Sequence, residues 1–334
     1  MKDKLFPIKD DGVAITMACS DSYKAIMGVL LESIVENANQ REDYDIVILE
    51  YDIPAEEKEK IRKYYQRDNI FIRFFNVKEA LDQFQLYVRD YLSIMTYARL
   101  LIPQIFADFH RVLYLDCDIV CAADVGELYH RDMQGMCLYA IPDVILNMEA
   151  WNNPNSEDTK RYLEDIVGAR KEGQYFNGGV IVFDIDAIKQ ENNSLFEIAE
   201  ERQWKWADQD VLNYVYCNRV MYGKIQWNAI VIANFKQRRR YLKRSGLYES
   251  YVEALENPRI IHYAGEMLPC YRRKVPLEQF FWKYAKSSLY FDAIIKRKKK
   301  KTSMKREILD ALAFIVPYDG KVRGMIKRLY KNKR

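Results

Sequence analysis

Two aspartates one residue apart follow an apolar run, and their type and spacing are suited to chemistry. Residues 111–121 read Arg-Val-Leu-Tyr-Leu-Asp-Cys-Asp-Ile-Val-Cys, so Asp116 and Asp118 come directly after Val112–Leu115. An extended chain points residues i and i+2 to the same side, so both carboxylates can face one object. Hard cations such as Mg²⁺ and Mn²⁺ take carboxylate oxygens and complete their shell with substrate phosphates. The pair predicts a divalent metal site, against the alternative of two solvated acids in a loop.

A strand inside a parallel sheet is the element expected to position this pair. Val112–Leu115 is apolar or aromatic without helical spacing, which is typical of a strand covered on both faces. Open α/β sheets bind their ligands beyond the carboxyl ends of the strands. We therefore expect Asp116 and Asp118 at that edge of an α/β sheet.

The first eighty residues predict how such a sheet begins. Alternating patterns indicate three strands and two helices in the order β-α-β-α-β, at 13–18, 23–37, 46–49, 55–66 and 70–75. Neither a Gly-x-Gly-x-x-Gly loop nor a Gly-Lys-Ser/Thr loop follows the first strand, which argues against a dinucleotide site or a P-loop. A nucleotide would be held in another way, for instance by Tyr23 stacking on a base.

Two charged residues stand out further along the chain. Arg99 lies in a mostly apolar helix predicted over 91–106, where it either pairs with a structural carboxylate or clamps an acid or a phosphate. Asp143 follows a strand predicted over 136–141 and either contacts a bound sugar or caps a turn. Residues 144–172 are polar and rich in asparagine with little hydrophobic period, so we expect a long functional loop there.

The second half of the chain adds polar groups at element ends. Phe176–Asp184 reads as a tight loop and a buried strand, and its paired glycines allow a ligand close to the backbone. Asp208-Gln-Asp stands at a predicted helix start, where capping explains an aspartate but not Gln209. His262 ends a last short strand. A lone histidine is more often structural, yet imidazole is the natural nitrogen ligand to add to two aspartates at a Mn²⁺ site.

Composition indicates a globular protein with reduced thiols. The 334 residues are 49% hydrophobic and 30% charged, without an apolar run near the roughly 18 residues of a membrane span. The charged N-terminus lacks the apolar core of a signal peptide, so we expect a cytoplasmic protein. The six cysteines are too scattered for a disulfide framework, and the three histidines leave little room for a histidine-rich metal site.

The positive net charge of +4 belongs to the tail. Residues 296–334 hold 15 of the 52 Lys and Arg and 3 of the 48 Asp and Glu, which leaves 37 against 45 in the remainder. Amphipathic segments at 308–316 and 322–330 suit an anionic membrane surface. A solvated tail is the alternative, and nucleic acid is less favoured because the body is acidic and has no reading module. We predict a body over 1–275 and a basic, helical tail over 276–334, peripheral on the inner face of the plasma membrane.

Taken in order, these motifs resemble one known family. The stretches that carry the resemblance are Ala18–Tyr23, Ser93–Arg99, Val112–Asp118, Phe176–Val180, Asp208–Asp210 and His262–Gly265. Over roughly 13–275 the chain resembles glycosyltransferase family 8, especially the bacterial galactosyl- and glucosyltransferases that build lipopolysaccharide and other surface glycans. The resemblance implies a GT-A type nucleotide-sugar-binding fold with a mostly parallel central sheet. It also implies a UDP-hexose donor, Mn²⁺ with Mg²⁺ as the alternative, a glycan or glycolipid acceptor, and transfer with retention of configuration.

The resemblance further implies roles for single residues. Asp116, Asp118 and His262 would hold the metal, and Tyr23 would stack on uracil. Residues expected to line the donor site are Ala18, Cys19, Ser20, Ser22, Tyr23, Arg99, Asp116, Cys117, Asp118, Asn177, Gly178, Asp208, Gln209, His262 and Gly265.

Catalysis would fall to the Asp208-Gln209 pair. Gln209 would lie on the reacting face of the anomeric carbon, with its amide carbonyl stabilising an oxocarbenium-like carbon during front-face attack. Asp208 would address the donor sugar, and Asp143 would contact the donor or acceptor sugar. No carboxylate nucleophile of the kind used by retaining hydrolases is evident.

Two departures from the family pattern are visible. Ser20 and Ser22 stand where family members commonly carry an acid and an asparagine that read the uracil edge, so uracil is read less specifically here. Leu268 stands where the family has a lysine that meets the diphosphate. Residues 272–274, Arg-Arg-Lys, are the expected replacement for that lysine.

Two other functions compete with the transferase. A strand followed by Asp-x-Asp also describes the nucleophile loop of haloacid-dehalogenase-like phosphatases, with Asp116 as nucleophile and Asp118 as acid/base. That interpretation leaves Asp208-Gln-Asp and His262 unexplained. The other is a membrane-associated scaffold with a degenerate donor site, and Leu268 is its best support.

Overall fold

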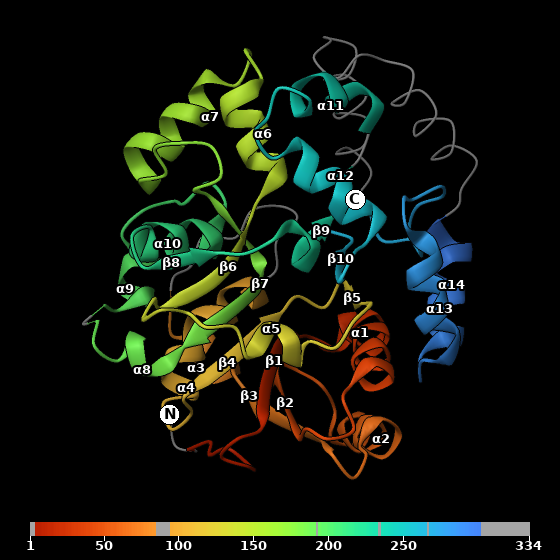
Figure 1. Ribbon diagram of the computed structural model, residues 1–334. Coiled ribbons are helices and arrows are strands. Elements are labelled where there is room, and N and C mark those ends of the chain that lie inside the picture. The colour runs from red at the N-terminus through yellow and green to blue at the C-terminus, as the bar shows by residue number, and fades with distance from the viewer. Residues whose placement is uncertain (1–3, 85–93, 192, 233–234, 266, 302–334) are drawn as a thin grey trace.

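The computed structural model describes residues 4–84, 94–191, 193–232, 235–265 and 267–301. A seven-stranded sheet in the order β3-β2-β1-β4-β7-β6-β8 runs through its centre, and a smaller sheet has the order β5-β10-β9 (Figure 1). The strands are β1 Val13–Cys19, β2 Tyr44–Glu50, β3 Ile70–Asn76, β4 Arg111–Leu115, β5 Ile119–Cys121, β6 Leu138–Pro142, β7 Phe176–Asp184, β8 Val220–Tyr222, β9 Ala229–Ile230 and β10 Ile260–His262.

Helices cover the sheets and extend beyond one end of the main sheet. In Figure 1, α6, α7, α11 and α12 lie in the upper part of the view, and α13 and α14 stand beside α1 on the right. The helices are η1 Asp21–Tyr23, α1 Lys24–Asn37, α2 Ala55–Tyr65, α3 Lys78–Asp82, η2 Ile94–Leu101, α4 Ile102–Ile105, α5 Gly126–Tyr129, α6 Val144–Asn152, α7 Glu157–Tyr162, η3 Leu163–Val167, α8 Ile185–Ile188, α9 Leu195–Glu200, α10 Ala207–Tyr216, η4 Ile225–Asn228, α11 Phe235–Leu242, α12 Tyr248–Glu256, α13 Glu278–Ser287 and α14 Phe291–Lys301.

The main sheet is mostly parallel, as predicted. β1 pairs in parallel with β2 and β4, β2 pairs in parallel with β3, and β7 runs antiparallel to β4 and β6. α1 and α2 connect the first three strands, which confirms the β-α-β-α-β start. Every residue of β2 is buried, and this accounts for the apolar run Ile46–Leu49 within it.

Alternation along the strands divides the core between the two faces of the sheet. Val47 and Leu49 join the hydrophobic cluster that contains Tyr97 of η2, whereas Ile46 and Ile48 join the cluster built against α1. Each such side chain stabilises the fold by roughly 1.5–3 kcal/mol. Hydrophobic packing on both faces of the sheet therefore fixes the strands in place. It also fixes the position of the residues that follow the strand ends.

The prediction of a long polar loop over 144–172 is wrong, because α6, α7 and η3 occupy much of it. Asp143 caps α6, since its Oδ1 accepts a hydrogen bond from the Leu146 amide at 2.9 Å. Asn147 is fully buried, and its side-chain amide donates to the carbonyls of Asp143 and Tyr175 at 2.8 and 2.7 Å. A polar residue thus occupies a core position of α6, which hides the helical period from a hydrophobicity pattern.

α13 and α14 continue the chain past the predicted body and pack on α1. The hydroxyl of Tyr284 accepts a hydrogen bond from Asn37 at 2.9 Å, and Gly28 leaves room for the ring of Tyr290, which would lie 2.7 Å from a Cβ at that position. The amphipathic segments predicted at 308–316 and 322–330 lie outside the described residues, and the boundary at 275 stays a prediction. Among the residues described, none of the helices has the length and apolar character that crossing a membrane requires.

Candidate active site

Asp116 and Asp118 lie at the carboxyl end of β4, as predicted. The Asp116 amide donates to the carbonyl of Gly179 on β7 at 2.8 Å, and the chain then turns into β5. β5 pairs antiparallel with β10, with Ile119 opposite His262, and this pairing returns the histidine to the aspartates. One potential ligand atom from each of Asp116, Asp118 and His262 lies within 4.8 Å of the other two. The structure thus brings together the three residues expected to hold a metal.

The orientation of the His262 ring suits a metal ligand. Nδ1 lies 3.0 Å from Oδ1 of Asn228, whose Nδ2 in turn donates to Asn177 at 2.9 Å, so Nδ1 carries a proton. Nε2 faces the aspartates, 3.2 Å from Asp118 and 3.8 Å from Asp116. Burial lowers the pKa of His262, but Asp118 and Asp116 outweigh it and raise the pKa above its ordinary value. Two carboxylates and an oriented imidazole form a donor set that fits Mn²⁺ or Mg²⁺.

Arg99 ties this cluster to a second aspartate. Its guanidinium is buried, with Nε 2.5 Å from Oδ2 of Asp208 and Nη2 3.2 Å from Oδ1 of Asp116, and it lies 4.8 Å from the centre of the Tyr114 ring. Of the two alternatives for Arg99, the structure shows the ion pair with carboxylates, and the clamp on an acid or a phosphate stays a prediction. Asp208 also accepts a hydrogen bond from Thr96 at 2.7 Å. Burial raises the pKa of Asp208 to about 6 against the opposing effect of Arg99, so the carboxylate is ionised at neutral pH.

The paired glycines of β7 are required by these side chains. A Cβ on Gly179 would overlap the His262 ring and lie 2.8 Å from Oδ2 of Asp116. A Cβ on Gly178 would overlap the Arg99 guanidinium, which donates to the Gly178 carbonyl. The backbone of β7 is therefore approached by the side chains of the site itself, at positions where only glycine fits.

Three polar side chains meet beside the glycines. Oδ2 of Asp143 accepts hydrogen bonds from Asn177 at 3.0 Å and from Gln209 at 3.3 Å. Oε1 of Gln209 accepts from the Gly178 amide at 2.8 Å, which fixes the direction of its amide group. Asp143 therefore caps α6 with one oxygen and faces the site with the other. Its expected sugar contact stays a prediction.

The start of α10 presents Asp208 and Gln209 to the site. Ala207 has a φ of +52°, so the chain bends sharply just before these two residues. Asp210 holds the bend, because its carboxylate accepts from the Trp206 amide at 2.7 Å and from the hydroxyls of Tyr162 and Tyr175 at 2.7 and 2.6 Å. Of the two aspartates, Asp210 satisfies the helix start, and Asp208 is directed at Arg99.

The end of β1 and the loop after it border the Asp-Cys-Asp turn. The Cys117 thiol donates to the Ala18 carbonyl at 3.2 Å, and the hydroxyls of Ser20 and Ser22 lie 3.0 Å apart. Burial raises the pKa of Tyr23 well above its ordinary value, and the charge of Asp118 raises it further. The other residues expected in the donor site are Cys19, buried at the end of β1, and Gly265, exposed after β10 with a φ of +66°.

Comparison with known proteins identifies the family. The model of glycosyl transferase family 8 matches residues 14–269, well over half of the chain. The chain belongs to glycosyl transferase family 8. It is 26% identical over 278 residues to a lipopolysaccharide 1,2-glucosyltransferase of Escherichia coli strain K12, which covers 78% of this chain and 76% of that relative.

Solved structures agree with this family assignment. The family 8 chain superposes on WbbM, a bifunctional glycosyltransferase in its apo form, with a TM-score of 0.78 and 27% identity, covering 88% of this chain and 53% of WbbM. It superposes on the galactosyltransferase LgtC in complex with donor and acceptor sugar analogs with a TM-score of 0.65 and 23% identity, covering 83% and 96% of the two chains. The α/β architecture is therefore the predicted GT-A type.

At Leu268 the resemblance led us to expect a lysine, and the structure shows what the leucine does. Leu268 is buried, and it packs with Met267, Val275 and Phe281 in the hydrophobic cluster that joins the loop after β10 to α13 and α14. Of the expected replacements, Arg273 and Lys274 are exposed, whereas Arg272 is half-buried with Nη1 3.7 Å from the Met267 sulfur. Their role at a diphosphate stays a prediction.

Sequence reasoning missed three residues of the site. Thr96 is three positions before Arg99, so helical spacing could have paired the two. Tyr114 is two positions before Asp116 on the same strand, and its hydroxyl donates to that carboxylate at 2.8 Å. Asn228 carries no local signal, because it reaches His262 only through the pairing of β9 with β10.

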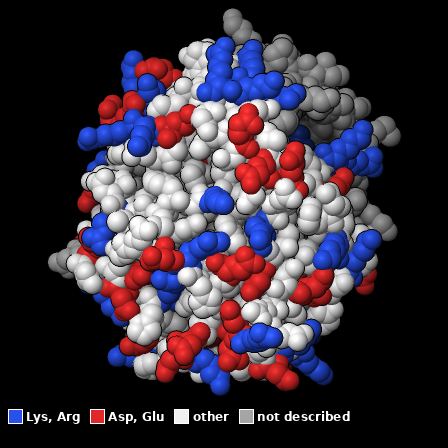
Figure 2. Space-filling view, viewed as in Figure 1, with Lys and Arg blue, Asp and Glu red and all other residues white. Residues whose placement is uncertain are grey.

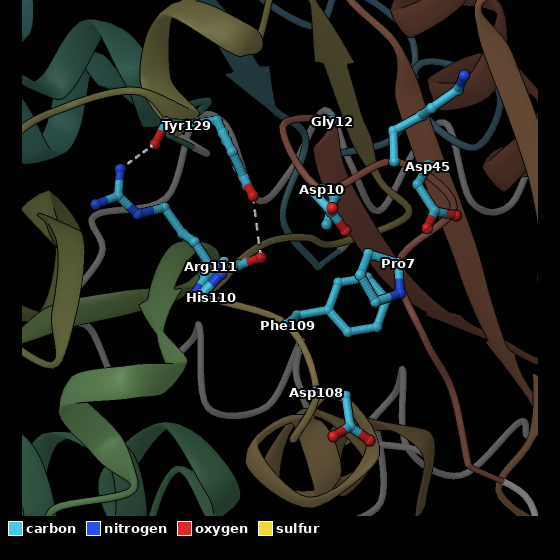
Figure 3. A pocket seen from close by; sticks show the side chains of 11 residues that line it. Pro7, Asp10, Gly12, Asp45, Asp108, Phe109, His110, Arg111 and Tyr129 are labelled. Atoms are coloured by element: carbon cyan, nitrogen blue, oxygen red, sulfur yellow. Dashed lines mark hydrogen bonds between the residues drawn. The ribbon is translucent and has the colours of Figure 1, made fainter.

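A pocket of about 60 Å³ lies elsewhere, at the amino end of the strands (Figure 3). Asp45, His110, Arg111 and Tyr129 are among its lining residues. Arg111 begins β4 and Asp116 follows its end, so the two edges are about 17 Å apart at roughly 3.3 Å per residue. In Figure 3 the Arg111 and Tyr129 side chains each bond to backbone carbonyls, at 2.7 and 3.2 Å. This pocket is not part of the candidate active site.

Proposed function

We propose that this chain transfers a hexose, galactose or glucose, from a UDP-sugar to a glycan acceptor, with a divalent metal and with retention of configuration. The observation that carries the proposal is the cluster of Asp116, Asp118 and His262, whose ligand atoms lie within 4.8 Å of one another. Gln209 of α10 and Arg99 of η2 adjoin the cluster, and both bond to Gly178 of β7. The lipopolysaccharide glucosyltransferase relative and the galactosyltransferase LgtC support a hexose as the transferred group.

The metal cluster serves the leaving group in this proposal. Asp116, Asp118 and Nε2 of His262 would hold Mn²⁺ or Mg²⁺. When bound, the ion supplies Lewis-acid neutralisation of the charge that develops on the departing diphosphate. Asn228 keeps the proton on Nδ1 of His262 and so leaves Nε2 free to coordinate. Arg99 holds Asp116 in place through its 3.2 Å contact and adds a fixed positive charge.

The sugar would lie against Asp143, Asn177 and Gln209. These groups already orient one another through hydrogen bonds of 3.0 to 3.3 Å, so they present a pre-organised set of donors and acceptors to sugar hydroxyls. The Gln209 carbonyl oxygen is the acceptor we assign to the reacting face of the anomeric carbon. Positive charge that develops on that carbon would be stabilised by this oxygen.

The hydrogen bonds and ion pairs of the nearby carboxylates support the proposed front-face attack. Asp143 accepts from two amides, Asp208 pairs with Arg99, and Asp210 accepts from three donors. None of these three is free to act as a nucleophile. In our proposal the acceptor hydroxyl forms its bond to the anomeric carbon as the bond to the diphosphate oxygen breaks. The hydroxyl proton passes to the departing phosphate, so no protein base is needed.

A thermal-shift panel tests the donor site without an acceptor. UDP-glucose, UDP-galactose, UDP-N-acetylglucosamine and GDP-mannose are each added with Mn²⁺ and with EDTA. A ligand at 100 times its dissociation constant stabilises a protein by about 2.7 kcal/mol, so we expect a shift of several degrees with one UDP-hexose and Mn²⁺. Asp118→Asn should abolish the shift, and Asp108→Asn, an exposed aspartate far from the site, should preserve it.

The outcome also separates this proposal from the scaffold. Leu268, buried where the family has its phosphate-binding lysine, is the observation that favours a degenerate donor site. No shift with any nucleotide-sugar, in a folded protein, would contradict the transferase and support the scaffold. In the transferase proposal, the acceptor is part of lipopolysaccharide, capsule or another surface glycan, as the name of the E. coli relative suggests.

A further inference from the structure

The carboxyl-terminal helix α14 contacts the loop expected to hold the nucleotide base. The Arg297 guanidinium donates through Nη2 to the carbonyl of Ser22 and through Nη1 to the hydroxyl of Tyr271 at 3.1 Å. Arg297 therefore joins three segments that are distant in sequence, namely α14, the loop after β1 and the loop after β10. α14 lies beyond residues 14–269, the range over which the family model matches.

Both partners of Arg297 adjoin the proposed donor site. Ser22 lies in η1 next to Tyr23, the residue expected to stack on the base. Tyr271 lies in the loop that follows His262, and Tyr271 and Tyr23 both pack against the hydrophobic cluster that contains Leu268. The Arg297 guanidinium thus links the loop after β1 to the loop after β10, and the base is expected to bind between these two loops.

The loop after β1 is restrained mostly by short-range bonds. η1 is only three residues long and has no side-chain cap. The hydroxyls of Ser20 and Ser22 bond to each other, the Ser20 carbonyl accepts from the Tyr23 amide and the Cys19 thiol, and Asp21 pairs with Lys24 at 2.5 Å. A longer-range bond runs from the Asp21 amide to Asp52 at 2.7 Å. A single 3-10 turn is weakly stabilised by its own hydrogen bonds. The charged hydrogen bond from Arg297 to the Ser22 carbonyl therefore helps to fix the conformation of η1.

α14, in contrast, does not depend on Arg297 for its place. Ile294 is fully buried in the cluster shared with α1 and α13. The hydroxyl of Tyr290 bonds to Glu57 at 3.1 Å, and the amide of Leu289 donates to Tyr65 at 3.0 Å. The helix is anchored one turn and more before Arg297, so the consequence of the Arg297 contact falls on the loop.

We propose that Arg297 is a positioning residue of the nucleotide site, and that it orders residues 20–23 and Tyr271 to receive the base. The helix beyond the family core is then part of the donor site. This inference rests on the proposed function, since it assigns the loop to the nucleotide. It explains how Ser20 and Ser22 can serve in place of more specific base-reading residues, because the loop that carries them is positioned by the Arg297 guanidinium.

The test compares Arg297→Ala with Lys296→Ala, a neighbouring exposed residue whose loss removes the same charge. Titration calorimetry with UDP in the presence of Mn²⁺ gives the dissociation constant, and UDP-sugar turnover gives KM and kcat. We expect R297A to raise the dissociation constant and KM about tenfold, the factor that corresponds to about 1.4 kcal/mol, with kcat little changed. K296A should match the wild type, and Arg297→Lys, which keeps one charged donor, should fall between.

Hydrogen exchange gives a readout that needs no ligand. The amides of residues 21–24 should exchange faster in R297A and at the wild-type rate in K296A, while α13 keeps its protection. Unchanged exchange together with unchanged UDP affinity in R297A overturns the inference. If R297A lowers the melting temperature, Tyr271→Phe decides: unchanged UDP affinity in Y271F also overturns it. A wild-type protein that binds no UDP contradicts the proposed function instead, before any variant is compared.

Discussion

At the scale of single residues, Gly179 is a position where the site leaves no room for a larger side chain. A Cβ there would overlap the His262 ring and come within 2.8 Å of the Asp116 carboxylate. We therefore expect Gly179→Ala to push the imidazole away from the aspartates. The affinity for Mn²⁺, measured by calorimetry, should fall at least tenfold, and the free energy of unfolding should fall by about 1–3 kcal/mol.

Gly246→Ala is the matched control for Gly179. A Cβ on Gly246 would make an ordinary contact, 3.7 Å from Glu172, so this variant should bind Mn²⁺ as the wild type does. Wild-type Mn²⁺ affinity in G179A would contradict the assignment of His262 as a ligand. It would show that the ring can move without loss of the ion.

Asp208 predicts a pH dependence of stability. Burial raises its pKa to about 6 from the usual 3.8, so the folded protein keeps a proton that the unfolded chain loses between these values. The contribution to the free energy of unfolding is present below about pH 4 and is lost as the pH rises through 6, a change of about 3 kcal/mol. Asp208→Asn removes the titrating group. The stability of the wild type relative to D208N should therefore decline between pH 4 and pH 7.

Urea unfolding of the metal-free protein at several pH values measures this difference. Asp158→Asn, at an exposed position of α7, serves as the control and should leave the pH dependence of the wild type unchanged. A constant stability difference between wild type and D208N across this range would mean that the pKa of Asp208 is not raised in the folded protein. The Arg99 charge, 2.5 Å from the Asp208 carboxylate, would then offset the effect of burial in full.

At the scale of elements, the sequence predicts best what is local. The first part of the chain alternates between strand and helix patterns, from β1 to β3. β4 is an apolar run that ends at the two aspartates. The edge at which Asp116 and Asp118 lie follows from this, because ligands bind beyond the carboxyl ends of parallel strands.

What the sequence does not show is set by pairing between distant strands. His262 reaches the aspartates because β10 pairs with β5, some 140 positions earlier in the chain, and Asn228 reaches His262 because β9 pairs with β10. No hydrophobic period encodes such a register. The resemblance to family 8 named His262 as a ligand, but it did not name Asn228, which is the group that sets the protonated nitrogen.

Buried polar side chains in helices are a second feature that the sequence analysis did not predict. Asn147 in α6 satisfies two backbone carbonyls inside the protein, so it is buried for its hydrogen bonds and not for its hydrophobicity. The helix predicted over 91–106 is present from residue 94 as η2 and α4, but the pairing of Thr96 and Arg99 with Asp208 was not predicted. In both cases the polar side chain bonds to a partner outside its own helix, and a pattern of apolar residues does not show such a partner.

At the scale of the whole molecule, charge is separated along the chain. Residues 1–295 carry 37 Lys and Arg against 45 Asp and Glu, whereas residues 296–334 carry 15 against 3. On the face shown in Figure 2 the two signs are interspersed over much of the body, and Lys and Arg gather at the top, over α11. α11 and the turn after it contribute Arg238, Arg239, Arg240, Lys243 and Arg244.

This separation predicts attachment to anionic membranes through the tail. We expect the full chain to sediment with vesicles of phosphatidylcholine and phosphatidylglycerol and not with phosphatidylcholine alone, because each basic residue contributes about 1 kcal/mol near an anionic surface. Binding should weaken steeply with salt. A chain that ends at residue 301 keeps every described element and should lose most of the binding, while its response to UDP-sugar and Mn²⁺ stays that of the full chain.

The basic residues of α11 supply the control for this attachment. Arg239, Lys243 and Arg244 are exposed, so replacing all three by Gln removes as much charge as a short piece of the tail without touching the tail itself. Vesicle binding close to that of the wild type in this variant would assign attachment to the tail. Retained binding by the 1–301 chain, lost only when α11 is also neutralised, would contradict the tail as the anchor and place the membrane against α11, the helix that pairs with α6 through Arg238 and Glu149 at 3.6 Å. Because Asp143 caps the start of α6 and accepts a hydrogen bond from Gln209, such a result would bring the lipid surface to the side of the molecule where the sugar is expected.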